Sequence, residues 1–154
     1  MRLWHKNLIP YLPKQQLLGQ WRELNSIYTN QNKHILINYV YEYDKNDLLI
    51  YSLRIIVQMR IRGYKVNFVN FCRYFGLEDK IEEFIYQFKQ SKEQFAFYSY
   101  AICVKNGPSW VEEPFPKHHD EEYLEICCWN LYEKYIRGQE GFTEESIKFI
   151  KENL

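Results

Sequence analysis

Apolar residues recur at helical spacing along most of this 154-residue chain, whereas strand-like alternation is weak. The pattern is clearest after Pro13, a residue that suits the first turn of a helix. From there one apolar face follows at steps of three and four residues: Leu17, Leu18, Trp21, Leu24, Ile27 and Tyr28. The chain therefore predicts an all-α fold, and residues 35–43 (ILINYVYEY) are the one ambiguous run.

Capping residues and glycines mark the ends of further expected helices. The expected starts are Asn46 or Asp47, Asp120 and Thr143, and the expected ends are Gly63 and Gly138. Helical patterns also lie on both sides of Gly76, in residues 66–75 and 78–90. Residues 106–119 hold three of the five prolines and are expected to form a loop over the surface.

Length and composition predict a single compact multi-helix domain over residues 1–154, with the N-terminal segment packed against the first long helix. The chain is 46% hydrophobic and contains 14 Tyr, 10 Phe and 4 Trp, which excludes a disordered protein. Its apolar runs are far shorter than the roughly 20 residues of a membrane span. No signal-peptide stretch opens the sequence, so a cytoplasmic protein is expected.

The formal net charge is zero, but the charge is unevenly distributed along the chain. Residues 1–76 form a basic half with a balance of +7, and residues 77–154 form an acidic half with a balance of −7. The basic half would present a favourable surface to an anion such as nucleic acid. A chance imbalance between two solvated faces explains the same numbers, and the charge pattern alone does not separate these alternatives.

Cysteine and histidine positions favour no metal site. The four cysteines are expected to be reduced and mostly packed: Cys72, Cys103, Cys127 and Cys128. His118, His119, Asp120 and Cys127 are close in sequence, but their spacing fits no standard metal site. We therefore expect no metal ion at these residues.

Gly19 lies in the middle of the first expected helix, where glycine costs about 1 kcal/mol relative to alanine. It shares the face opposite the apolar stripe with Arg22 and Glu23. Either a ligand approaches these charges over Gly19, or another helix packs closely there. Taken alone, adjacent Arg22 and Glu23 are typical of a solvated surface.

The opening residues carry the most specific pattern in the chain. They read MRLW, followed by LIPYLPKQQLLGQWREL, and this stretch resembles the bacterial relatives of the phage-type pyrimidine-dimer DNA glycosylases (the endonuclease V family) almost letter for letter. The phage branch shares the small residue at position 19 and the Arg-Glu-Leu at 22–24. The resemblance continues at Lys33–His34, YEYDK and RGYKVN, and so covers residues 1–67; beyond them only NLYEK is similar.

This resemblance implies a bifunctional repair enzyme that acts on double-stranded DNA carrying damaged bases, such as pyrimidine dimers, or abasic sites. Such an enzyme cuts the bond between sugar and base and then nicks the strand by β-elimination. The implied nucleophile is the free α-amine of Met1, assisted by Glu23. Because an α-amine has a pKa of about 7.7–8.0, a useful fraction is neutral and nucleophilic near pH 7. We expect the protein to act as a monomer.

The same resemblance implies a DNA-binding set: Arg2, Gln16, Arg22, Lys33 and His34. The two arginines would hold phosphates that flank the lesion. Gln16 precedes Glu23 by seven residues and so shares its stripe on the first helix. Members of the family also kink the duplex and turn a base out of the stack, which costs a few kcal/mol.

Two departures from the phage pattern leave alternatives open. Arg2 is too bulky for ordinary removal of Met1. Either the retained Met1 supplies the amine, or the protein is a non-catalytic nucleic-acid-binding protein that retains the fold. Ser26 stands where the phage branch has a further basic residue. A third alternative is an interaction protein whose acidic, aromatic half docks a protein partner.

Overall fold

The computed structural model describes residues 2–106 and 113–154, and within these ranges it contains helices and no strands. The all-α prediction is confirmed. The α-helices are α1 (Lys14–Asn30), α2 (Lys45–Ile61), α3 (Val69–Tyr74), α4 (Ile81–Phe88), α5 (Lys92–Asn106), α6 (Glu121–Ile136) and α7 (Glu144–Glu152). The 3-10 helices are η1 (Lys6–Tyr11), η2 (Asn38–Tyr41) and η3 (Glu78–Lys80). No helix of the described ranges has the length and apolar content that crossing a membrane requires.

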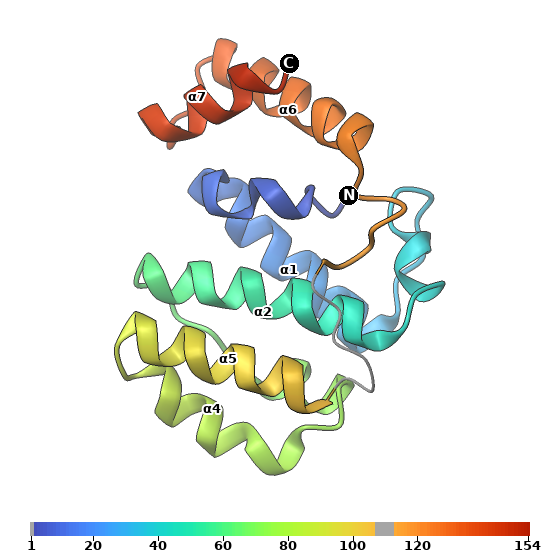
Figure 1. Cartoon of the computed structure of the whole chain (residues 1–154), viewed down its shortest axis with the longest axis vertical. Helices are drawn as coiled ribbons and strands as arrows, with labels where there is room; N and C mark the ends of the chain where they lie inside the picture. The colour runs from blue at the N-terminus through green and yellow to red at the C-terminus, as the bar shows by residue number, and fades with distance from the viewer. Residues whose placement is uncertain (1, 107–112) are drawn as a thin grey trace.

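The helices stack in layers along the long axis of the molecule (Figure 1). Helices α6 and α7 pack on each other at one end, and α7 also contacts η1. Helix α2 lies in the middle, between α1 on one side and α5 on the other. Helix α4 covers the outer side of α5 at the opposite end. The buried apolar side chains of these layers form one continuous cluster.

Helix α1 follows the predicted apolar stripe. Leu17, Leu24 and Ile27 are completely buried in the core, and the hydroxyl of Tyr28 donates to Ser52 Oγ at 2.5 Å. The helix ends at Gln31, whose positive φ of 47° turns the chain away while its N–H donates to the Ile27 carbonyl. Because the apolar stripe faces the core, the opposite face of α1 carries the polar residues.

Several predicted helix ends are confirmed, and one is wrong. Asp120 and Thr143 cap α6 and α7 through their side-chain oxygens. Helix α2 begins earlier than predicted, because Asp44 caps it by accepting the Asn46 N–H. Asp47 is not available as the cap, since its carboxylate accepts a hydrogen bond from the backbone of Phe115.

The loop predicted at residues 106–119 is confirmed for residues 113–119, but it does not lie wholly on the surface; residues 107–112 lie outside the described residues. Pro114, Phe115 and His119 are buried. The Phe115 N–H donates to Asp47 Oδ2 at 2.9 Å, and its ring packs edge-on against Tyr39. Residues 113–119 therefore attach the chain before α6 to α2 and η2.

Two segments had no clear pattern in the sequence. The ambiguous run 35–43 contains η2 rather than a strand. Helix α5 was not predicted, because it is apolar on both its buried and its exposed side and so lacks a single apolar face. Phe95 and Ile102 are buried in the core, whereas Phe97 is 73% exposed.

Candidate active site

Gln20, on α1, clamps the N-terminal segment to the helix. Its side-chain Oε1 accepts the Trp4 N–H at 2.7 Å, and its Nε2 donates to the Arg2 carbonyl at 3.1 Å. The side-chain amide thus pairs with residues 2–4 as the backbone of a neighbouring strand would. Because Gln20 is 2% exposed, water does not compete for these bonds.

Two tyrosines hold the same segment from other helices. The hydroxyl of Tyr51, on α2, donates to the Trp4 carbonyl at 2.6 Å and lies 2.9 Å from Gln20 Oε1. The hydroxyl of Tyr123, on α6, donates to the Leu3 carbonyl at 2.5 Å. Burial raises the pKa of both tyrosines far above the ordinary value, so both remain protonated donors. The expected packing of the N-terminal segment against the first long helix is confirmed.

A pocket of about 400 Å³ opens beside this clamp. Three segments line it: the N-terminal segment, the polar face of α1, and α6. Its lining residues are Arg2, Trp4, Gln15, Gln16, Gly19, Gln20, Arg22, Glu23, Asn130 and Lys134. The structure therefore brings together four of the residues that the sequence analysis proposed: Arg2, Gln16, Arg22 and Glu23.

Glu23 is the unusual group in this pocket. Its Oε1 is buried and has no hydrogen-bond partner among the described residues. Burial raises the pKa of Glu23 above its ordinary value, and the charge of His34 acts in the opposite direction. Leaving a buried acceptor unpaired costs about 1–3 kcal/mol. A pocket carboxylate with a raised pKa and an unpartnered buried oxygen is typical of a functional site rather than of a stabilising contact.

Two arginines line the same pocket as this carboxylate. Arg22 is exposed, and its Nη2 lies 3.6 Å from the position that a Cβ at Gly19 would occupy. The guanidinium carbon of Arg2 lies 5.7 Å from the ring centroid of Trp4. Neither arginine forms an ion pair with another residue of 2–106 or 113–154. Both are therefore available to bind an anion that enters the pocket.

Gly19 forms part of the pocket surface. A Cβ at this position would meet only Arg22 among the side chains nearby, at an ordinary contact distance. Among the described residues no other helix packs against Gly19, so the structure does not support the close-packing alternative. The absent side chain instead widens the approach to Arg22 and Glu23.

Gln16 lies at the edge of the pocket and is 8% exposed. Its amide pairs in both directions with that of Gln139: Gln16 Nε2 donates at 3.2 Å and Gln139 Nε2 donates back at 2.6 Å. Each amide keeps one further N–H and one further acceptor position. The pair connects α1 to the turn after α6.

Lys33 and His34 do not line the pocket. They are exposed on the loop after α1, and the His34 N–H donates to Asn38 Oδ1 at 2.8 Å. The charge of His34 nevertheless acts on Glu23, which places this loop on the same side of the molecule as the pocket. Met1 lies outside the described residues.

Several residues of this site are not predictable from the sequence. Gln20, Tyr51 and Tyr123 form the clamp, yet they are separated by 31 or more positions along the chain, so no local pattern connects them. Asn130 and Lys134, from α6, line the pocket. They fall in the NLYEK segment, where the resemblance gave no role to either residue.

The described residues contain no group of three or more His, Cys, Asp or Glu side chains that could hold a metal ion. His119 has both ring nitrogens engaged: Nδ1 accepts the Lys6 N–H at 3.0 Å, and Nε2 lies 2.6 Å from the Tyr39 hydroxyl. Burial lowers the pKa of His119 to about 2. It is therefore a neutral structural residue.

Comparison with known proteins gives one match. The family model for pyrimidine dimer DNA glycosylase matches residues 1–69. These residues include the N-terminal segment, α1 and α2, but not α6. The resemblance seen in the sequence is thus confirmed over this range. No curated protein and no solved structure gives a significant match.

Proposed function

We propose that the pocket beside Glu23 is the active site of a DNA repair glycosylase with AP-lyase activity. The observation that carries this proposal is the buried, unpartnered Glu23 Oε1 in a pocket that Arg2 and Arg22 also line. All three residues lie within the range that matches the family. The substrate is double-stranded DNA with damaged bases, such as pyrimidine dimers, or with abasic sites. The enzyme acts as a monomer in the cytoplasm, without metal or cofactor.

The nucleophile in this proposal is the α-amine of Met1. The clamp supports this assignment. Gln20 lies one turn before Glu23 on α1 and binds the carbonyl of Arg2, the residue that follows Met1 in the sequence. The neutral amine attacks the anomeric carbon of the sugar, and the bond from that carbon to the base breaks as the base leaves with a proton. The bond from the same carbon to the ring oxygen then breaks, the ring oxygen takes a proton, and an iminium forms. This covalent intermediate is the species that an experiment can trap.

Glu23 acts twice in the proposed reaction. As a carboxylate it stabilises the positive charge that develops on the sugar while the base departs. It then takes the proton from the neighbouring sugar carbon, and the 3′ carbon–oxygen bond breaks to nick the strand. The raised pKa of Glu23 suits this proton transfer, because a carboxylate with higher proton affinity is a better base.

The basic residues around the pocket hold the DNA. Arg2 and Arg22 bind the phosphates on either side of the lesion, and Lys33 and His34 extend this contact along the loop after α1. Gln16 contributes its remaining amide hydrogen at the pocket edge. Binding of this kind weakens steeply with salt, because counterions are released from the DNA.

A second candidate function is nucleic-acid binding without chemistry. The observation that favours it is Arg2, which prevents the processing that exposes a small N-terminal residue in the phage branch. Both candidates expect salt-dependent DNA binding. They differ only in whether a covalent intermediate forms.

Borohydride reduction of the protein on DNA with an abasic site tests the first candidate. The unmodified protein should form a stable adduct. Glu23→Gln should still form this adduct on abasic DNA, because the iminium precedes the proton transfer, but it should nick the strand much more slowly. The matched control Glu125→Gln, at an exposed position on α6, should behave like the unmodified protein. A version with a blocked N-terminus should bind DNA but form no adduct. Absence of any adduct with a protein whose free Met1 has been verified by intact mass would favour non-catalytic binding.

A further inference from the structure

The turn between α1 and η2 presents two apolar side chains to solvent. Ile35 is 85% exposed and Leu36 is 41% exposed, whereas the next residue, Ile37, is completely buried and anchors the turn. In Figure 1 this segment projects at the right-hand edge of the molecule, beyond the ends of α1 and α2. Lys33 and His34 precede the apolar pair, so the tip combines two apolar side chains with two basic ones.

Hydrogen bonds fix the shape of this turn. The His34 carbonyl accepts the N–H groups of Ile37 and Asn38, both at 2.8 Å. The side chain of Asn38 accepts the His34 N–H, also at 2.8 Å, and the imidazole Nδ1 of His34 accepts the Leu36 N–H at 3.2 Å. The exposed apolar tip is therefore held by its own backbone and does not need a partner to become ordered.

Further contacts attach the turn to the face of α1 that carries Glu23. Asn32 Nδ2 donates to Ser26 Oγ, and the Tyr41 hydroxyl donates to the Asn32 carbonyl. Ser26 follows Glu23 by three residues, so it lies on the same stripe of α1. The electrostatic interactions of Glu23 with His34 and with Tyr41 show the same proximity. The tip is thus fixed beside the carboxylate pocket.

We propose that Ile35 and Leu36 form a wedge that enters the base stack of duplex DNA when a damaged nucleotide turns toward Glu23. This inference rests on the proposed function, because it assigns the wedge to the same site. Apolar side chains inserted between base steps unstack them and kink the duplex. Lys33 and His34 stand next to the tip, where they meet the phosphates that the wedge must pass.

The size of the tip favours a base stack over a protein surface. Protein-docking sites expose contiguous apolar patches of several hundred Å², whereas this turn offers two side chains bordered by basic residues. A wedge needs no larger area, since one or two side chains fill the space between neighbouring base pairs. Ile35 therefore points to a DNA duplex as the partner of this tip.

The test uses the double variant Ile35→Ala/Leu36→Ala. Nicking of an abasic duplex under single-turnover conditions should fall about tenfold, because opening the stack becomes slower. Nicking of the same abasic strand without its complement should stay within about twofold, since there is no duplex stack to open. The control Ile85→Ala removes an exposed apolar side chain on α4, far from the pocket in the fold, and should leave both rates unchanged.

A second readout does not depend on chemistry. A duplex with 2-aminopurine beside the abasic site becomes more fluorescent when that base loses its stacking. Binding of Glu23→Gln should raise this fluorescence, and adding Ile35→Ala and Leu36→Ala should abolish the rise at saturating protein. The conservative Ile35→Met should retain it, which excludes general damage to the turn.

These outcomes separate the two proposals. If the unmodified protein does not nick DNA but still unstacks 2-aminopurine through Ile35 and Leu36, the repair activity fails and the wedge stands. If the double variant nicks the duplex and raises fluorescence as the unmodified protein does, the wedge is wrong and the activity stands. Equal loss of nicking on duplex and single strand also overturns the wedge.

Discussion

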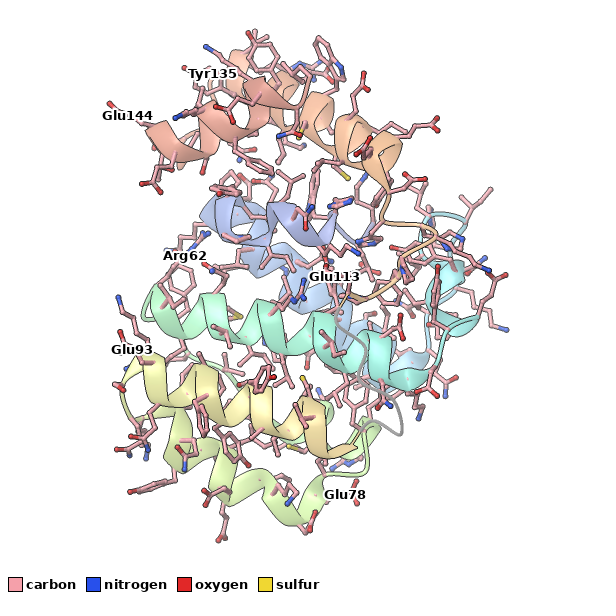
Figure 2. The ribbon with its side chains drawn as sticks, viewed as in Figure 1. Arg62, Glu78, Glu93, Glu113, Tyr135 and Glu144 are labelled. Atoms are coloured by element: carbon pink, nitrogen blue, oxygen red, sulfur yellow. The ribbon has the colours of Figure 1, made fainter. Side chains whose placement is uncertain are left out.

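Glu113 and Glu23 both lie near basic side chains, but their surroundings differ. Glu113 Oε2 lies 3.4 Å from Lys6 Nζ and 3.3 Å from Arg54 Nη1, between η1 and α2 (Figure 2). Glu23 shares its pocket with Arg2 and Arg22 but has a buried oxygen without a partner among the described residues.

The pKa values express the same contrast. Partial burial raises the pKa of Glu113, but the hydrogen bonds and charges of Arg54 and Lys6 outweigh it, so the net pKa lies below the ordinary value. The pKa of Glu23 is raised, chiefly by burial. A paired carboxylate stabilises the fold, whereas a buried carboxylate oxygen without a partner among the described residues costs stability and is typical of functional sites. Charge composition alone does not distinguish these two cases.

The largest expected difference between the two glutamates is in activity. Glu23→Gln should lower the rate of strand nicking by about 10²-fold or more, the usual contribution of a general acid–base group. Glu113→Gln should change that rate by less than about twofold, because exposed ion pairs contribute little beyond stability. Single-turnover cleavage of an abasic duplex measures both. If both changes lowered the nicking rate equally, Glu23 would have no special role in the reaction.

The clamp offers a second way to sharpen the comparison. Gln20→Ala leaves the buried N–H of Trp4 without its acceptor and should lower the free energy of unfolding by about 1–3 kcal/mol. It should also reduce nicking, since it releases the segment that carries Arg2 to the pocket. Thermal denaturation and single-turnover cleavage test both effects. The matched change Gln15→Ala, at an exposed position of α1, should alter stability by less than about 0.5 kcal/mol.

The smallest effects concern stability and have opposite signs. Glu23→Gln should raise the free energy of unfolding at pH 7 by about 1 kcal/mol, because it removes an unfavourable buried charge. Glu113→Gln should lower it by about 0.5 kcal/mol, since an exposed ion pair is lost. Urea denaturation at pH 7 measures both variants. A loss of stability in Glu23→Gln would show that its carboxylate has a stabilising partner.

The pH dependence follows from the direction of each shift. A raised pKa in the folded state means that ionised Glu23 destabilises the fold, so the advantage of Glu23→Gln should shrink as the pH falls through the pKa of this group. A lowered pKa means that ionised Glu113 stabilises the fold, so the deficit of Glu113→Gln should also vanish in acid. At pH 7 the denaturation curves of the two variants should therefore differ from that of the unmodified protein. At pH 3 all three curves should converge.

The sequence predicted the parts of the structure that depend on local pattern. The stripe through Leu17 and Leu24 and the caps at Asp120 and Thr143 follow rules that act within one or two helical turns. Phe115 was misjudged, because its proline-rich surroundings indicate a loop, whereas its burial depends on distant rings and on Asp47. Local sequence carries no information about such long-range contacts.

The sequence predicted the part of the candidate site that lies on α1, but not the parts that other helices contribute. The resemblance pointed to Arg22 and Glu23, and the structure places both at one pocket. The clamp of Gln20 and the approach of Lys134 were not predictable, because they depend on how α6 packs beside the N-terminal segment. The family match ends at residue 69, so only the fold shows that α6 completes the pocket.

We propose that the α-amine of Met1 supplies the nucleophile that Glu23 assists. Peptide mapping of the borohydride-trapped adduct by mass spectrometry tests it most directly. The account predicts that the DNA remnant is attached to the α-amine of Met1. Attachment to a side-chain amine instead, above all that of Lys134 at the pocket wall, would contradict it.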